Sequence, residues 1–240
     1  MSVKYLKDAS STLVREELFN FKLFYDLKIA AAKREYHLKI FSANVDFEGF
    51  DIVIDDDDKI GRYQIKTKLD SSTKIWEIHK GILLPNNRNA ELMRFDNGLC
   101  RHFDCGVILM DISPSLNEDD NYQVDYYYTD YYIIKSIATR LIKRNKRTVV
   151  LAEKIIEQLV LTKKYNDRIM IRQSLFVKLK SPSALLSICG FDSIENKQIQ
   201  YLSMKLFERN KIRIKDIESD KEFSAYKKAF IYELNDLIEK

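Results

Sequence analysis

Two short runs of alternating apolar and polar residues, separated by a polar turn, constrain the fold of this chain most strongly. In the first run, Phe50, Ile52 and Ile54 occupy one face and aspartate or valine occupies the other. Residues 62–68 alternate in the same way, and the segment between the runs contains three consecutive aspartates, Asp56–Asp58, and Gly61. This pattern predicts a β-hairpin.

The remaining periodicity predicts helices around one further strand. Residues 106–112 form a nearly continuous apolar run, typical of a strand buried on both faces. The spacing of apolar residues predicts a long helix over residues 11–36. Further helices are expected at residues 74–83, 131–144 and 148–164. The expected buried face of this long helix is Val14, Leu18, Phe21, Tyr25, Ile29 and Ala32. The chain is therefore predicted to be an α/β protein.

The charge is unevenly distributed along the 240 residues. Residues 1–134 contain 17 basic and 23 acidic side chains, whereas residues 135–240 contain 23 and 13. We expect a core at 1–134 and a basic, mainly helical region at 135–240 that binds DNA or forms a dimer.

Hydropathy and cysteine usage indicate a cytoplasmic protein. No stretch approaches the roughly 18 apolar residues of a membrane span, and the N-terminus lacks an apolar signal core. The three cysteines are an odd number and predict no disulfide framework, which favours a reducing compartment.

The predicted hairpin brings together side chains that suit a divalent cation. Gln64 and Lys66 are two residues apart on one strand and project from the same face, and Asp51 lies on the neighbouring strand. Mg²⁺ in proteins needs only one or two carboxylates, with water and substrate oxygens completing its shell. A lysine beside such a site can orient an attacking water or stabilise charge on a phosphate.

This arrangement resembles the PD-(D/E)xK nuclease superfamily, which has the restriction-endonuclease-like fold. Gly49-Phe50-Asp51 followed by Gln64-Ile65-Lys66 is similar to the Gln-x-Lys form found in Mrr-type restriction nucleases and phage-defence nucleases. The resemblance covers about residues 10–135 and implies a mixed-sheet core flanked by helices.

The resemblance also implies roles for individual residues. Asp51 would be the central metal ligand, with the Gln64 side-chain oxygen and the Ile65 carbonyl completing the inner shell, and Lys66 would position or activate water. A helical carboxylate normally joins them, and Glu17 is preferred to Glu16 because Glu17 borders the expected buried face. Glu48 remains a further alternative.

Basic residues are expected to contact the nucleic acid. Most of them lie on a predicted helix beside a cluster of tyrosines at 126–128, 131 and 132, a combination that suits phosphate contacts and base stacking. The candidates are Lys68, Lys135, Arg140, Lys143, Arg144, Lys146 and Arg147.

The implied activity is a Mg²⁺-dependent DNA endonuclease of restriction or phage defence that leaves a 5′-phosphate, with Mn²⁺ substituting for Mg²⁺. Double-stranded DNA is the expected partner, and a homodimer is expected because one site per chain must cut two strands. No organic cofactor is expected, since no P-loop or dinucleotide fingerprint occurs. Two alternatives stay open: an inactive nucleic-acid-binding protein on the same fold, which the neutral Gln64 motivates, and an RNA- or structure-specific nuclease.

Overall fold

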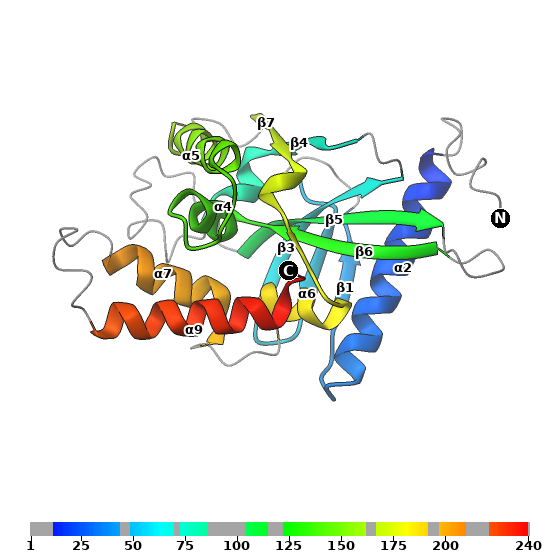
Figure 1. Ribbon diagram of the computed structural model, residues 1–240. Coiled ribbons are helices and arrows are strands. Elements are labelled where there is room, and N and C mark those ends of the chain that lie inside the picture. The colour runs from blue at the N-terminus through cyan, green and yellow to red at the C-terminus, as the bar shows by residue number, and fades with distance from the viewer. Residues whose placement is uncertain are drawn as a thin grey trace.

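The computed structural model in Figure 1 describes residues 12–43, 49–69, 73–85, 104–114, 122–161, 167–191, 197–209 and 221–239. The described helices are α2 (Thr12–Ala32), α4 (Tyr131–Ala138), α5 (Lys146–Val160), α6 (Pro182–Ile188), α7 (Ile199–Arg209) and α9 (Lys221–Leu237). The strands are β1 (Lys39–Ser42), β2 (Ile52–Asp55), β3 (Ile60–Lys68), β4 (Ile75–His79), β5 (Asp104–Pro114), β6 (Tyr122–Thr129), β7 (Arg168–Arg172) and β8 (Val177–Lys178). Two 3₁₀ helices, η2 (Lys80–Leu83) and η3 (Gln173–Leu175), complete the set.

A six-stranded mixed sheet forms the centre of the molecule, with the strand order β1-β2-β3-β5-β6-β8. The predicted hairpin is confirmed, because β2 and β3 pair antiparallel with Ile52 opposite Tyr63. β3 and β5 are parallel, and the other neighbours in this sheet are antiparallel. The expected apolar strand is also confirmed: residues 105–110 of β5 are all buried. The protein is therefore a mixed α/β structure.

The prediction of a helix over residues 74–83 is wrong. This segment begins as strand β4, which pairs antiparallel with β7 in a separate two-stranded sheet, and continues as η2. Trp76 and Ile78 are buried while Ile75 and Glu77 are exposed, which is the period of a strand. The pairing partner lies about ninety residues later in the chain, so local periodicity could not reveal it.

Helix α2 forms as predicted but turns a different face to the core. Its buried residues are Phe19, Leu23, Leu27, Ala30 and Ala31. The expected face is instead exposed, and Phe21 and Tyr25 are 60% and 64% accessible. Both faces carry apolar residues at helical spacing, so periodicity alone could not decide which of them packs inward.

The basic run after residue 134 does not lie on one helix. α4 ends at Ala138, Arg140 follows with φ 61°, and Asn145 caps α5 by accepting a hydrogen bond from the Thr148 amide. The left-handed backbone at Arg140 cannot continue a right-handed helix, which explains the early end of α4. Among the described helices, none is long and apolar enough to cross a membrane.

The predicted boundary at residue 134 does not separate two cores. β7 pairs with β4 and β8 pairs with β6, so strands from the second segment complete both sheets. α6 packs against α2, while α7 and α9 lie side by side (Figure 1). One continuous hydrophobic cluster includes residues from Phe19 to Leu234.

Candidate active site

A cavity of about 380 Å³ lies where α2, the end of β1, the β2–β3 hairpin and β4 meet. Most of its lining is polar, with two carboxylates, one ammonium, one amide and two hydroxyls. The lining residues are Glu16, Asn20, Ser42, Ala43, Asp51, Ile65, Lys66, Thr67 and Trp76. The hairpin therefore delivers Asp51, Ile65 and Lys66 to one cavity, as the sequence predicts.

Asp51 is held in place by backbone hydrogen bonds to the neighbouring strand. Its amide donates to the Tyr63 carbonyl at 2.9 Å, and its Oδ2 accepts from the Ile65 amide at 2.5 Å. Gly49, two residues earlier, has φ +75° and lies so close to the His79 ring that a Cβ there would overlap it. The Gly-x-Asp motif thus has a physical basis, because only glycine readily adopts this backbone in this space.

Lys66 lies half-buried beside this carboxylate. Within the part of the chain that the structure describes, its ammonium has no ion pair. Lys68, two residues on, differs because its Nζ is 2.5 Å from Asp111 Oδ2 and its side chain is only 11% exposed. Of the two lysines on this face of β3, Lys66 is therefore the one whose charge faces the cavity without a carboxylate partner.

The helical carboxylate that lines the cavity is Glu16, and Glu17 does not line it. This reverses the sequence-based preference, and the cause is the helix face. Glu16 lies one helical turn before the buried Phe19 and so on the same side of α2. Glu17 lies one turn after Val14 and one turn before Phe21, both exposed, and so shares their face. Asn20, one turn after Glu16, also lines the cavity. Glu48 lies outside the described residues.

Gln64 is not among the residues that line the cavity. Its side chain is buried, and its Oε1 accepts a hydrogen bond of 3.2 Å from the His79 amide. The oxygen predicted to be a metal ligand therefore bonds to the backbone of β4. Sequence spacing placed Gln64 on the correct face of β3 but could not reveal this competing donor.

The expected stacking of bases on tyrosines is wrong for most of the cluster. Tyr126, Tyr128, Tyr131 and Tyr132 are buried in the core, so they offer no platform to a base. Tyr127 alone is half-buried.

The basic candidates are spread over different local environments. Lys135 is half-buried in α4, and Arg140, Lys143, Lys146 and Arg147 are exposed. Arg144 donates to the Phe176 carbonyl at 3.2 Å, and burial lowers the pKa of its guanidinium. Arg147 lines a cavity that is separate from the candidate active site.

Sequence reasoning missed several lining residues, namely Asn20, Ser42, Thr67 and Trp76. Thr67 lies next to Lys66 and could have been nominated by its position alone. The other three come from α2, β1 and β4, so only the tertiary structure brings them to the hairpin.

The donor set suits a hard cation that keeps part of its water shell. Glu16 and Asp51 provide carboxylates, and Asn20 and Thr67 provide neutral oxygens, which matches the sparse protein ligation typical of Mg²⁺. Across the described residues, no group of three or more carboxylate, histidine or cysteine side chains gathers. Comparison with protein-family models, curated proteins and solved structures found no match.

Proposed function

We infer that this protein is a Mg²⁺-dependent DNA endonuclease with a restriction-endonuclease-like core, of the kind used in restriction or phage defence. The observation that carries this inference is the 380 Å³ cavity in which Glu16, Asp51 and Lys66 meet on the mixed sheet. Two carboxylates and a lysine around a solvent-accessible cavity are a donor set suited to phosphodiester hydrolysis.

The three side chains have two kinds of role in the proposed reaction. Glu16 and Asp51 would hold Mg²⁺, with the Ile65 carbonyl as a further ligand, and the bound cation would act as a Lewis acid on the scissile phosphate. The Lys66 ammonium orients the attacking water and stabilises charge that develops on the phosphate. The backbone hydrogen bonds of Asp51 keep its carboxylate fixed before substrate arrives.

Plasmid cleavage with Mg²⁺ or Mn²⁺ tests this function. Lys66→Ala and Asp51→Asn are expected to lower the cleavage rate at least about 100-fold, since each removes a group that acts on the reacting phosphate or its metal. EDTA should stop cleavage by the wild type. Retention of normal cleavage by both variants would contradict the proposed site.

Glu16→Gln and Glu17→Gln form a matched pair on adjacent positions of α2. Each removes one negative charge, but only Glu16 lines the cavity. Glu16→Gln is expected to lower cleavage about 10-fold or more and to raise the Mg²⁺ concentration needed for half-maximal rate, whereas Glu17→Gln leaves both unchanged. The opposite ranking would restore Glu17 as the helical ligand.

A second candidate function is an inactive nucleic-acid-binding protein on the same fold. The observation that favours it is the hydrogen bond between Gln64 Oε1 and the His79 amide, which keeps this oxygen from the cavity. Calorimetry separates the two functions, because an active site should take up Mn²⁺ in a manner that Asp51→Asn abolishes. A chain that binds DNA without such uptake fits the second function.

A further inference from the structure

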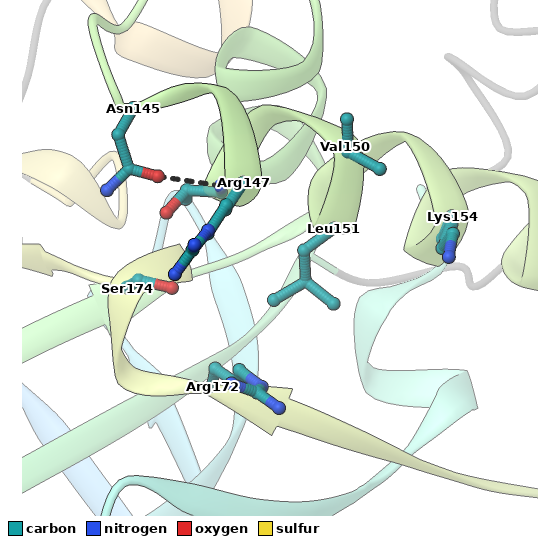
Figure 2. A pocket seen from close by; sticks show the side chains of 8 residues that line it. Asn145, Arg147, Val150, Leu151, Lys154, Arg172 and Ser174 are labelled. Carbon is teal, nitrogen blue, oxygen red and sulfur yellow. Dashed lines mark hydrogen bonds between the residues drawn. The ribbon is translucent and has the colours of Figure 1, made fainter.

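A second cavity, of about 320 Å³, lies between α5 and the segment that runs from β7 into η3. Figure 2 shows Arg147 and Leu151 projecting from α5 toward the segment that carries Arg172 and Ser174, and Lys154 lines the same cavity from α5. The walls therefore come from two parts of the chain that are separated by residues outside the described structure. No residue of this cavity lines the candidate active site.

The lining of this cavity is strongly cationic. Arg147, Lys154 and Arg172 contribute three positive charges, and none of the described residues that line the cavity is a carboxylate. None of the three makes an ion pair or hydrogen bond to another described side chain. Arg168, on the same strand as Arg172, is by contrast 2.9 Å from Glu77 Oε2. Three cations on one cavity repel one another, so an anionic ligand would be bound favourably there.

Neutral donors complete the cavity. Thr148 and Ser174, two hydroxyl residues, line the cavity. Asn145, Arg147 and Thr148 place the first turn of α5, with the positive end of the helix dipole, at its edge. Leu151 supplies an apolar wall from the middle of the helix. Guanidinium groups that bind two oxygens at once, together with hydroxyl donors, are the recognition chemistry of a phosphate group.

The strand pair β4–β7 connects this cavity to the candidate active site. Arg172 is the register partner of Ile75, and the next residue, Trp76, lines the first cavity. Paired strands lie about 4.8 Å apart. Arg172 lies on the exposed side of this pair and Trp76 on its buried side, so the two cavities are neighbours in the fold but lie on different sides of β4–β7. A duplex carries a phosphate for about every 1.7 Å of its axis, so a duplex that extends past the active site offers further phosphates along its length.

We propose that the cavity formed by Arg147, Lys154, Arg172 and Ser174 binds a phosphate group, and that the DNA backbone supplies it. The phosphate chemistry rests on this cavity alone, whereas the choice of DNA as its source rests on the proposed function. A free nucleotide carries the same chemistry, and the test has a separate arm for it.

The first arm measures binding of a short fluorescent duplex by anisotropy in EDTA, where metal-dependent cleavage cannot occur. Arg172→Gln and Lys154→Gln are expected to weaken binding about 5- to 10-fold, and each should reduce the slope of log K against log salt by about 0.9. Arg168→Gln is the matched control, with the same charge change on the same strand outside the cavity, and should weaken binding less than about 2-fold. All three positions are exposed, so the fold is expected to persist, which far-UV circular dichroism checks.

The second arm titrates a nucleoside monophosphate by calorimetry into the same proteins. Dependence of duplex binding on Arg172 and Lys154 supports the backbone as the source, and dependence of mononucleotide binding alone supports a free nucleotide at the same phosphate site. If Arg172→Gln, Lys154→Gln and Arg168→Gln bind the duplex with equal affinity, and also bind the mononucleotide with equal affinity, the proposal is overturned. A chain that never cuts DNA but loses duplex affinity in Arg172→Gln would refute the proposed function and leave this proposal standing.

Discussion

Gly49 is the residue whose backbone most directly positions the candidate catalytic carboxylate. Its φ of +75° and its approach to the His79 ring allow the chain to turn into β2, so that Asp51 reaches the Ile65 amide. Gly49→Ala is expected to cost about 2–4 kcal/mol in the free energy of unfolding, from the left-handed backbone and the overlap with His79. Urea denaturation measures this loss.

A second substitution separates the two causes of that loss. In a His79→Ala background, Gly49→Ala should cost less, because the ring is gone and only the backbone strain and the contact with the Cβ of residue 79 remain. An equal cost in both backgrounds would show that the ring contact contributes nothing.

Asp130 makes stability depend on pH. It caps α4 by accepting from the Ile133 amide, and it also accepts from Tyr128 and Gln200. Burial, partly offset by these hydrogen bonds, raises its pKa from 3.8 to about 6. Because the folded state then holds a proton that the unfolded state releases, stability contributed by the neutral acid is lost as the pH rises from about 4 to about 6.

Asp130→Asn tests this dependence. Asparagine caps a helix as well as aspartate does and does not titrate. Relative to wild type, the variant should gain about 2–3 kcal/mol of stability between pH 4 and pH 7, at roughly 1.4 kcal/mol per pKa unit. Urea midpoints across that range measure the difference, and parallel curves for the two proteins would refute the raised pKa.

At the scale of the element, α2 contributes to the site and also presents an apolar face to solvent. Val14, Leu18, Phe21 and Tyr25 are exposed at spacings of four, three and four residues, the pattern of a helix–helix seam. If the proposed enzyme cuts both strands as a homodimer, this face is the surface we expect to form it.

Phe21→Glu should therefore convert a dimer into a monomer. The introduced carboxylate would be desolvated at the centre of the helix pair, which opposes association. Size-exclusion chromatography with light scattering gives the mass, with Tyr232→Glu, at a still more exposed aromatic on α9, as the control. A wild-type monomer, or a dimer unaffected by Phe21→Glu, would exclude this face.

At the scale of the whole molecule, one core spans both halves of the chain. Lys59, at the start of the β3 segment, pairs with Asp104 at 2.8 Å and donates to the Cys189 carbonyl and to Gln200. A single half-buried side chain thus links the hairpin, β5, the end of α6 and α7. The basic region therefore packs into the same core as the sheet.

Truncation after residue 134 is therefore expected to abolish cooperative folding. The shortened chain lacks β7, the partner strand of β4, and β8, which pairs with the outer edge of β6. It also lacks α6, which packs against α2. The full chain should unfold in a single urea transition by circular dichroism, whereas residues 1–134 should show none. A cooperative transition in the fragment would indicate an independent first domain.

The sequence by itself determined the elements whose signal is local. Alternation of period two defines the β2–β3 hairpin, and a continuous apolar run defines β5. The hairpin pattern also supplies Asp51, Ile65 and Lys66, three of the nine residues that line the candidate site. These features depend on neighbours a few residues away, so the chain carries them in its pattern.

Only the tertiary structure decided which surfaces meet. It determined which apolar face of α2 packs inward, and so placed Glu16 rather than Glu17 at the cavity. It also paired β4 with β7, and it placed the His79 amide where it donates a hydrogen bond to the Gln64 side-chain oxygen. Arg147 and Arg172 line one cavity for the same reason. Each of these contacts joins elements far apart in the chain, where periodicity carries no information because the partner is chosen by the packing of the whole core.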